Sequence, residues 1–494
     1  MYYLGLDIGS SSIKVALVAV ATGKSIDVVQ EPETEMGMIA LKNGWAEQDP
    51  ERWWKHVCRA IARLQKEHQV KANEITGIGI SYQMHGLVVV DAQGAVLRPS
   101  IIWCDSRAVS IGDEAFEAIG PEQCSTRLLN SPANFTASKL KWVKDNEPEL
   151  YAKIHKFMLP GDYIAYKLSG TINTTISGLS EGMLWDFEKG SVAQLLLDHY
   201  GIDAALVPDI VPTFGKQSTV NATGASESGL SEGTAIFYRA GDQPNNALSL
   251  NVFQPGEVAA TGGTSGVVYA VTDSLSSKES ARVNNFAHVN YTQNGAPRIG
   301  KLLCINGAGI QYRWLLNNLS VESYKEMNDL ADTVPIGSDG VCMIPFGNGA
   351  ERMLNNSEVG SHVLHMNLNN HNKAHLCRAA LEGIAFSFVY GMEIMKSDGI
   401  TVNVMRVGND NLFRSEIFAI TVATLIGYEI ELYNTTGAIG AARAAGLHQG
   451  DFDKFGEYVM NNDYITTFAP SETQQPYREA YALWKNELTT IINK

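Results

Sequence analysis

Two short runs of glycine and hydroxyl residues contain the groups most able to bind phosphate. One run covers residues 9 to 12 (GSSS) and the other covers residues 262 to 266 (GGTSG). Exposed backbone N–H groups and serine or threonine hydroxyls both donate hydrogen bonds to phosphate oxygens at close range. Asp7 ends the segment that leads into the first run, where its carboxylate could hold Mg²⁺ directly or through water. Since the chain contains no G-x-x-x-x-G-K-[ST] sequence, any nucleotide must be held without the common phosphate loop.

Each run lies between two segments of strand-like composition. Residues 3 to 8 and 13 to 20 flank the first run, and residues 257 to 261 and 267 to 271 flank the second. Taken alone, each arrangement is more typical of an ordinary hairpin turn than of a binding site. Because the arrangement recurs about half a chain later, we interpret the pair as an internal duplication of one unit.

Strands and helices alternate between and after the two predicted hairpins. Asp49 and Pro50 indicate the start of a helix, and the apolar residues Trp53, Val57 and Ile61 share one face of it with Leu64. This alternation in both halves predicts an α/β fold with two domains, which we expect at residues 1 to 249 and 250 to 494. The other predicted strands are at 75 to 81, 87 to 90 and 403 to 407, and the other predicted helices are at 308 to 317, 374 to 394, 412 to 426 and 438 to 447.

Length, charge and cysteine usage limit the class of protein. A chain of 494 residues exceeds what one core of about 100 to 200 residues needs, so two or more domains are expected. The net charge of −15 and the absence of a Lys/Arg-rich run argue against nucleic-acid binding. Six cysteines without a C-x-x-C pair fit a reducing compartment, and no run of about 18 apolar residues predicts a membrane span. We therefore expect a cytoplasmic protein that binds neither nucleic acid nor membrane.

Read in order, the motifs of this chain resemble those of the FGGY family of carbohydrate kinases. The first half carries GLDIGSSSIK from residue 5, WAEQDPERWW from residue 45, QMHG from residue 83 and WCDSR from residue 103. The second half of the resemblance runs through Gly241-Asp242, GTSG from residue 263, NGAGIQ from residue 306, Glu351-Arg352 and GAIGAAR from residue 437. The resemblance as a whole covers essentially the entire chain. It implies two ribonuclease H-like domains of the actin and hexokinase type, with an active site between them that closes on its substrate and excludes water.

The resemblance also implies which residues bind and phosphorylate the sugar. Asp242 is implied to be the general base that accepts the proton of a terminal sugar hydroxyl, whose oxygen then attacks the γ-phosphorus of Mg-ATP. The QMHG motif is similar to that of family members that act on xylulose, where Met-His takes the place of an Arg-Glu pair in glycerol kinases. A five-carbon ketose is therefore favoured over glycerol. The implied sugar-binding residues are Gln83, Met84, His85, Trp103, Asp105 and Asp242, of which His85 and Asp105 can hydrogen bond to hydroxyls.

For the nucleotide, the resemblance implies contacts from both halves of the chain, with ATP and Mg²⁺ as cofactors and Asp7 as the metal ligand. Gly307 is implied to permit close backbone approach to the nucleoside. Residues 407 to 411 (VGNDN) depart from the Gly-Gly-Gly-Ala turn usual in the family, so side chains protrude where adenine would lie. The implied nucleotide contacts are Ser10, Ser11, Ser12, Lys14, Gly263, Thr264, Gly307, Gln311, Gly408 and Asn409.

Two further departures leave the identity of the sugar open. Gln243-Pro244 follows the implied base where many relatives have Asn-Ala, and Cys104 stands where an asparagine is common. Ribulose, fuculose, gluconate and glycerol therefore remain alternative substrates. An actin-like ATPase that acts as a switch or chaperone is the alternative from another class, although it leaves residues 83 to 85 and Asp105 without a task. By analogy with related kinases, a homodimer is expected.

Two other groups of residues receive no catalytic role. His371 and His375 have the i, i+4 spacing of a metal pair, but no third ligand accompanies them, and we assign them no function. Trp53 lies on the apolar face of its predicted helix, so packing is expected for it rather than sugar stacking.

Overall fold

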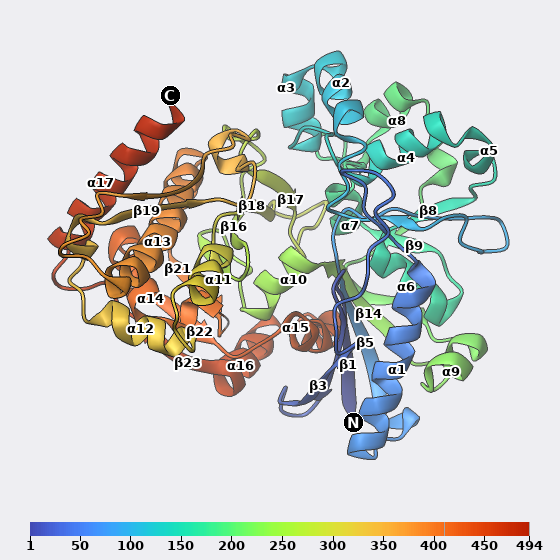
Figure 1. The fold of residues 1–494 in the computed structure, drawn as a ribbon. Coiled ribbons are helices and arrows are strands. Elements are labelled where there is room, and N and C mark those ends of the chain that lie inside the picture. The colour runs from blue at the N-terminus through green and yellow to red at the C-terminus, as the bar shows by residue number, and fades with distance from the viewer. Residues whose placement is uncertain (410, 494) are drawn as a thin grey trace.

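Two β-sheets form the frame of the protein, and the computed structural model describes them within residues 1 to 409 and 411 to 493, the side chain of Asn411 excepted. The sheets lie in two lobes, each with helices packed against its sheet (Figure 1). The first sheet has the order β13 (Phe214–Thr219), β14 (Ala235–Gly241), β5 (Ile75–Tyr82), β1 (Tyr2–Ile8), β2 (Ile13–Ala19), β3 (Ser25–Glu31). The second has the order β17 (Asn284–Ala287), β18 (Ile299–Ile305), β16 (Gly266–Thr272), β15 (Glu257–Gly262), β21 (Val404–Gly408), β22 (Ile430–Tyr433), β23 (Tyr464–Phe468).

The two sheets follow the same path. In the first, β1, β2 and β3 are antiparallel neighbours, while β5 and β14 run parallel to β1. In the second, β15, β16 and β18 are antiparallel neighbours, while β21 and β22 run parallel to β15. An antiparallel strand, β13 or β23, completes one side of each sheet, and β17 adds an edge strand to the second. This repeated topology confirms the predicted α/β class, both predicted hairpins and the duplication of their unit.

Most helices of the first half were not predicted individually, but α1 begins as the sequence indicates. The Asp49 side chain accepts a hydrogen bond from Glu51 N at 3.0 Å, and Trp53, Val57 and Ile61 are fully buried. The helices of this half are α1 (Pro50–His68), α2 (Val109–Ile119), α3 (Pro121–Gln123), α4 (Thr136–Asn146), α5 (Pro148–Tyr151), α6 (Pro160–Ser169), α7 (Ile176–Glu181), α8 (Gln194–Tyr200), α9 (Ala222–Ser228) and α10 (Asp242–Ser249). Its short strands are β4 (Glu47–Gln48), β6 (Val88–Val90), β7 (Ser100–Ile101), β8 (Lys156–Met158), β9 (Asn173–Thr175), β10 (Trp185–Asp186), β11 (Ser191–Val192) and β12 (Asp209–Val211).

The four helices predicted in the second half are present, with shifted ends. Helix α14 begins only at Glu416 because a 3₁₀ turn, Asn411–Arg414, precedes it, and α15 changes to a 3₁₀ turn after Ala444. The helices are α11 (Gly309–Asn318), α12 (Tyr324–Asp332), α13 (Lys373–Ser397), α14 (Glu416–Ile426), α15 (Gly437–Ala444), α16 (Phe452–Asp463) and α17 (Gln475–Ile492), and a hairpin is formed by β19 (Cys342–Phe346) and β20 (Gly360–Leu364). Among the described residues, no helix combines the length and the apolar character needed to cross a bilayer.

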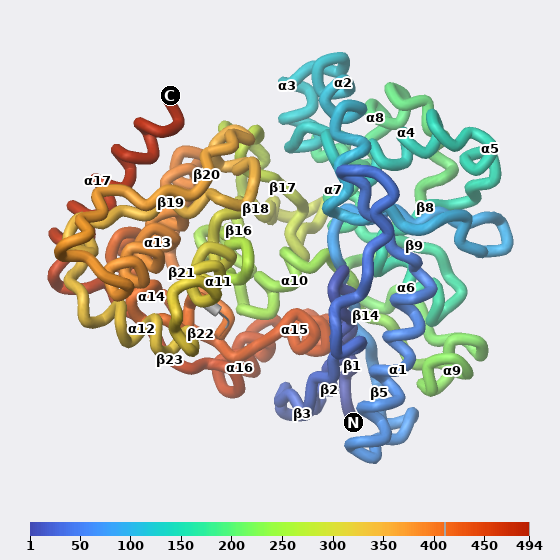
Figure 2. The backbone as a smooth tube through the Cα atoms, in the orientation of Figure 1, coloured from blue at the N-terminus to red at the C-terminus, as the bar shows by residue number. Residues whose placement is uncertain are grey.

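Helix α15 comes from the second half of the chain but packs on the first sheet (Figure 2). A Cβ atom at Gly5 would lie 1.9 Å from the Ala438 carbonyl oxygen, and one at Gly79 would lie 1.9 Å from the Ala441 carbonyl oxygen. Glycine therefore lets the helix approach β1 and β5 closely. Helix α10 lies against α15, where Asn245 Nδ2 donates to Gly437 O at 2.9 Å. These two helices connect the lobes.

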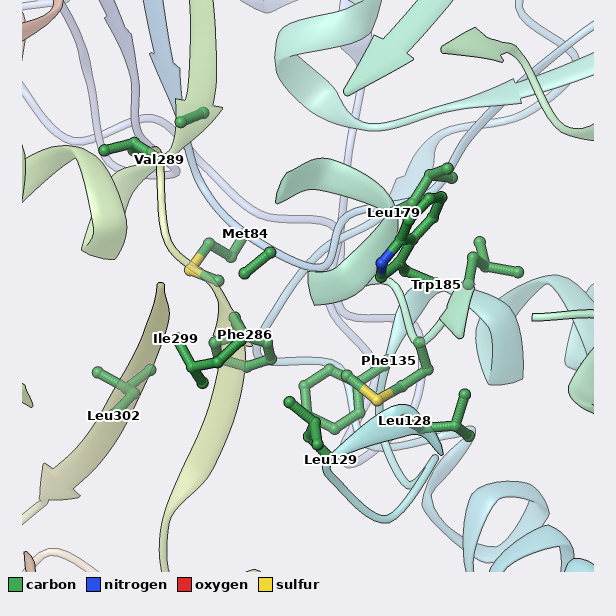
Figure 3. Packing of buried hydrophobic residues seen from close by; sticks show 14 of the residues in the cluster. Met84, Leu128, Leu129, Phe135, Leu179, Trp185, Phe286, Val289, Ile299 and Leu302 are labelled. Carbon is green, nitrogen blue, oxygen red and sulfur yellow. The ribbon is translucent and has the colours of Figure 1, made fainter. Parts of the chain in front are cut away.

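One hydrophobic core runs through the contact between the lobes. Figure 3 shows Phe286 of the second sheet packed near Met84 and Phe135 of the first lobe. Leu128, Leu129 and Leu179 belong to the same buried cluster, which also includes Ile299 and Leu302 on β18. The lobes are thus joined by packed side chains as well as by the two connecting helices.

Candidate active site

Three strands of the first sheet bring polar residues to one edge. Asp7 lies next to the end of β1, Gln83 follows β5 directly, and Asp242 follows β14 directly. Since these three strands are parallel, their carboxyl ends meet at the same edge. The pairing aligns Asp7 with Ser81 and Lys14 with Asp7, which sets the carboxylate between a hydroxyl and an ammonium group.

Asp242 is a half-buried carboxyl at the first turn of α10. Burial raises its pKa to about 7, and the negative charge of Asp7 contributes to the rise. Gly241, just before it, has no room for a side chain, because a Cβ atom there would lie 2.5 Å from Met84 Cγ and 2.6 Å from Glu181 Oε2. A carboxyl with a pKa near neutrality is well suited to accept a proton in a transfer reaction.

Asp7 and its surroundings fit a magnesium ion. Burial raises the pKa of Asp7, while Lys14 and Ser81 oppose the rise. Its Oδ2 atom lies 2.9 Å from the position that a Cβ atom of Gly437 would take, at the start of α15. The charge of Asp7 contributes to the raised pKa of Asp242, and a hard divalent cation held by the Asp7 carboxylate would offset that charge.

Both hairpin tips present backbone amides that the fold leaves free. Within the described part of the chain, the amides of residues 10 to 12 and 263 to 265 donate no hydrogen bond to another backbone group. The carbonyl groups behind them are occupied: Ser10 O accepts from Gln48 Nε2 at 2.7 Å, and Ser11 O accepts from Met36 N at 2.7 Å. In the second tip, Gly263 O and Thr264 O accept from the first residues of α11 at 3.1 and 3.0 Å. The hydrogen bonds to its carbonyl groups therefore fix each tip, and its N–H groups are available to bind an anion.

His85 presents one ring nitrogen for binding. Its Nδ1–H donates to the Glu181 carbonyl oxygen at 2.9 Å, which leaves Nε2 as a hydrogen-bond acceptor. Burial, with the nearby charge of Lys139, lowers the pKa of His85 to about 3, so the ring is neutral. A neutral acceptor of this kind suits a sugar hydroxyl.

The other predicted sugar-binding residues lie around this edge in different settings. Gln83 is buried; its Nε2 donates to Gln48 Oε1 at 3.4 Å, and its own Oε1 has no partner among the described residues. Met84 packs against Gly241. Trp103 is exposed, and its Nε1 donates to Ser10 Oγ at 3.3 Å, which connects the predicted sugar site with the first hairpin tip.

Asp105 is not free to bind a sugar in this structure. It is 0% exposed, and its Oδ2 accepts from Ala46 N at 2.6 Å. Arg107 donates to both carboxylate oxygens through its side chain and to Oδ1 through its backbone. With its oxygens engaged inside the protein, Asp105 fixes the loop that carries Trp103 and the segment around Ala46.

The predicted nucleotide-binding residues of the second half gather beside its hairpin tip. Gly307 needs to be glycine for packing, because a Cβ atom there would lie 2.3 Å from Pro345 O. Gln311, on α11, accepts a hydrogen bond from Ser361 Oγ at 2.7 Å. Gly408 ends β21, and the next residue, Asn409, donates from its amide to Tyr433 O at 2.7 Å. The departure at residues 407 to 411 includes Asp410, which lies outside the described residues, so the adenine contacts there stay a prediction.

Glu181 is a polar residue at this edge that sequence reasoning missed. It is 1% exposed, and neither carboxyl oxygen has a hydrogen-bond partner among the described residues. Burial raises its pKa well above the ordinary range; the Tyr82 hydroxyl opposes the rise, and the Asp242 charge adds to it. The surrounding sequence, SGLSEGM, contains no pattern that would have singled out this glutamate.

The fold is a two-lobed α/β architecture of the actin and hexokinase type. A solved glycerol kinase from Plasmodium falciparum with ADP shares the fold, with a TM-score of 0.88 over 99% of this chain and 98% of that chain at 19% identity. Residues 2 to 249 match the N-terminal domain of the FGGY family of carbohydrate kinases, and residues 258 to 448 match its C-terminal domain. The chain belongs to this family and is a carbohydrate kinase.

Two relatives are similar to this chain over nearly its whole length. It is 28% identical to a xylulose kinase of Bacillus subtilis over 99% of this chain and 97% of that protein. The crystal structure of a "xyloylose kinase" from Brucella ovis is similar to it with a TM-score of 0.87 and 26% identity, over 99% of both chains.

Proposed function

We propose that this kinase transfers the γ-phosphoryl group of Mg-ATP to the terminal hydroxyl of D-xylulose, which gives D-xylulose 5-phosphate. The observation that carries the proposal is the shared edge of β1, β5 and β14, where Asp7, residues 83 to 85 and Asp242 meet. The similarity to a xylulose kinase over nearly the full chain supports the choice of sugar.

In the proposed mechanism, Asp242 accepts the proton of the terminal hydroxyl as that oxygen forms its bond to the γ-phosphorus. ADP leaves as the bond from phosphorus to the bridging oxygen breaks. The raised pKa of Asp242 supports this role, because a base of pKa about 7 is largely deprotonated above neutrality and still binds a proton well. Asp7 would hold Mg²⁺, which neutralises charge on the phosphates when bound.

His85 and the hairpin tips position the reactants in this proposal. His85 Nε2 accepts a hydrogen bond from a sugar hydroxyl, and Gln83 Oε1, which has no partner among the described residues, offers a second acceptor. The free amides of residues 10 to 12 and 263 to 265, with the Thr264 hydroxyl and Lys14, bind phosphate oxygens. Asp105 acts indirectly, by holding the loop that carries Trp103.

An ADP-release assay over a panel of sugars and polyols tests this function. The panel contains D-xylulose, D-ribulose, L-fuculose, gluconate and glycerol. We expect kcat/KM for D-xylulose to exceed that for each other compound by about tenfold or more. A higher value for another member of the panel would replace xylulose as the substrate. ATP hydrolysis that no sugar stimulates would instead favour the actin-like switch.

A further inference from the structure

His85 is held in an unusual conformation by groups from several elements. Its backbone φ is +62°, in the left-handed region that non-glycine residues adopt rarely, so the surrounding structure must hold it there. Lys139 Nζ, on α4, donates to the His85 carbonyl oxygen at 2.9 Å. The ring of Phe135, the residue just before α4, lies edge-on at 4.7 Å between centroids. From α7, the Glu181 carbonyl accepts the Nδ1–H.

A further contact to the His85 ring comes from the other lobe. The ring of Phe286, on β17, lies 5.4 Å from the His85 ring between centroids and 6.0 Å from that of Phe135. Phe286 is 0% exposed although β17 is an edge strand of the second sheet, because the first lobe covers it (Figure 3). The sugar-binding histidine is thus packed between the two lobes.

The side-chain amide of Asn130, in the first lobe, makes two hydrogen bonds to the backbone of β17, as a neighbouring strand would. Asn130 Nδ2 donates to Asn285 O at 2.6 Å, and Asn285 N donates to Asn130 Oδ1 at 2.8 Å. The Asn285 side chain also donates a hydrogen bond, from Nδ2 to Leu129 O at 3.0 Å. Both asparagines are buried, so losing this pairing would leave buried backbone groups without partners.

The short helix α7 connects β17 to His85. Ala287 N donates to Ser180 Oγ at 2.8 Å, and Ser177 Oγ donates to Ala287 O at 3.1 Å. The residue after Ser180 is Glu181, whose carbonyl accepts the Nδ1–H of His85. One helix therefore contacts the strand of the second lobe through its hydroxyls and the histidine of the first lobe through its last carbonyl.

We propose that β17 is a positioning strand for sugar binding: its docking on Asn130 and α7 places Phe286 against His85 and holds Nε2 of that histidine toward the sugar. Sugar affinity is then coupled to the contact between the lobes, and the lobes cannot separate at β17 without releasing His85. The inference rests on the proposed function in one respect, that His85 binds the sugar. Phe286 and Asn130 are positioning residues in this view, since neither touches the substrate.

Steady-state kinetics with matched variants test the coupling. Phe286→Leu and Asn130→Ala should raise the KM for D-xylulose by about tenfold or more, while the KM for ATP and kcat stay within about threefold. Phe386→Leu is the control for Phe286, because Phe386 is also buried in the second lobe but packs on Tyr481 and Trp484. Asn173→Ala is the control for Asn130, because Asn173 bonds to Gln217 O within the first lobe. Equal KM changes in test and control variants would overturn the proposal.

A double substitution makes the kinetic test sharper. Because Phe286 acts through His85, its replacement should cost little further sugar affinity in a protein that already carries His85→Ala. Independent, multiplying effects of the two substitutions on KM would show that Phe286 does not act through the histidine, and the proposal would fall.

A measurement without substrate separates this inference from the proposed function. In protein labelled with ¹⁵N-histidine, the His85 signals, assigned by their loss in His85→Ala, should report the neutral tautomer with hydrogen on Nδ1. Phe286→Leu and Asn130→Ala should shift these signals or mix the two tautomers, and the control variants should not. Unchanged signals in both test variants would refute the positioning role, whereas shifted signals in a protein that phosphorylates no pentulose would refute only the proposed function.

Discussion

Replacing Asp242 by asparagine should slow turnover strongly and stabilise the protein at the same time. The carboxyl has a pKa of about 7 in the fold, raised by burial and by Asp7, against about 3.9 in an unfolded chain. A carboxyl with a raised pKa binds its proton more tightly in the folded state, so the protein loses stability as the pH rises from about 4 to about 7. The amide carries no charge and avoids this loss.

The size of the effect follows from the pKa difference. About three units correspond to about 4 kcal/mol at pH 8, and the partial exposure of the side chain reduces this toward about 2 kcal/mol. Asp242→Asn should therefore unfold at higher temperature than the wild type at pH 8, by a few degrees. At pH 4 the two proteins should unfold at nearly the same temperature, because the wild-type carboxyl is then protonated in the folded state and only about half ionised in the unfolded chain. Turnover should fall about 10²-fold or more.

Thermal unfolding and ADP release, each followed from pH 4 to pH 8, measure both effects. Asp105→Asn is the contrasting control: Asp105 is buried in an ion pair with Arg107, so its replacement should destabilise the protein by about 3 kcal/mol or more. The reasoning fails if Asp242→Asn keeps near-normal turnover, or if it lowers the unfolding temperature at pH 8 as Asp105→Asn does.

Three other expectations can be checked with the same protein. Wild-type kcat/KM for the sugar should fall about tenfold per pH unit well below pH 7. A higher Mg²⁺ concentration should shift this fall to lower pH, because a cation at Asp7 offsets the charge that raises the pKa of Asp242. If the pH dependence does not change with Mg²⁺, Asp7 is not the metal ligand. Glu181→Gln should remove part of the stability loss at alkaline pH, since the pKa of Glu181 is also raised, and an unchanged pH dependence of urea unfolding would contradict this. Gly5→Ala should destabilise the protein by about 3 kcal/mol, because its Cβ would lie 1.9 Å from Ala438 O, whereas Gly37→Ala, with no atom closer than 3.8 Å, should be neutral in the same urea titration.

The features that could be predicted from the sequence are those set by local chemistry. Turn residues between two strand-like segments identified both hairpins, and the apolar spacing after Asp49 identified α1. Asp242 and residues 83 to 85 were identified by the resemblance of their motifs to the family, and the structure places each directly after a buried strand. Their meeting at one edge then follows from the parallel order of β1, β5 and β14.

The features that were missed depend on contacts between distant segments. Asp105 was predicted to face the sugar, but Ala46 and Arg107 occupy its carboxylate. Ala46 lies 59 residues away in the sequence, and nothing in the motif around Asp105 indicates a contact with it. Glu181 belongs to the site only because the fold brings it next to Gly241 and Asp242, which lie about 60 residues further along the chain. The position of α15 on the first sheet, far from its place in the sequence, is equally invisible to periodicity.

Because α15 comes late in the chain, the first lobe cannot be completed until most of the protein has been synthesised. Arg443 Nε donates to Gly23 O at 2.7 Å across 420 residues, and the same region supplies the helix that covers Gly5 and Gly79. A ribosome that has made only residues 1 to 249 has therefore made a sheet whose face over β1 and β5 still lacks its cover. The first lobe must wait, with that apolar face open, for almost the whole polypeptide to emerge, and this interval is when nascent chains would be most prone to aggregate.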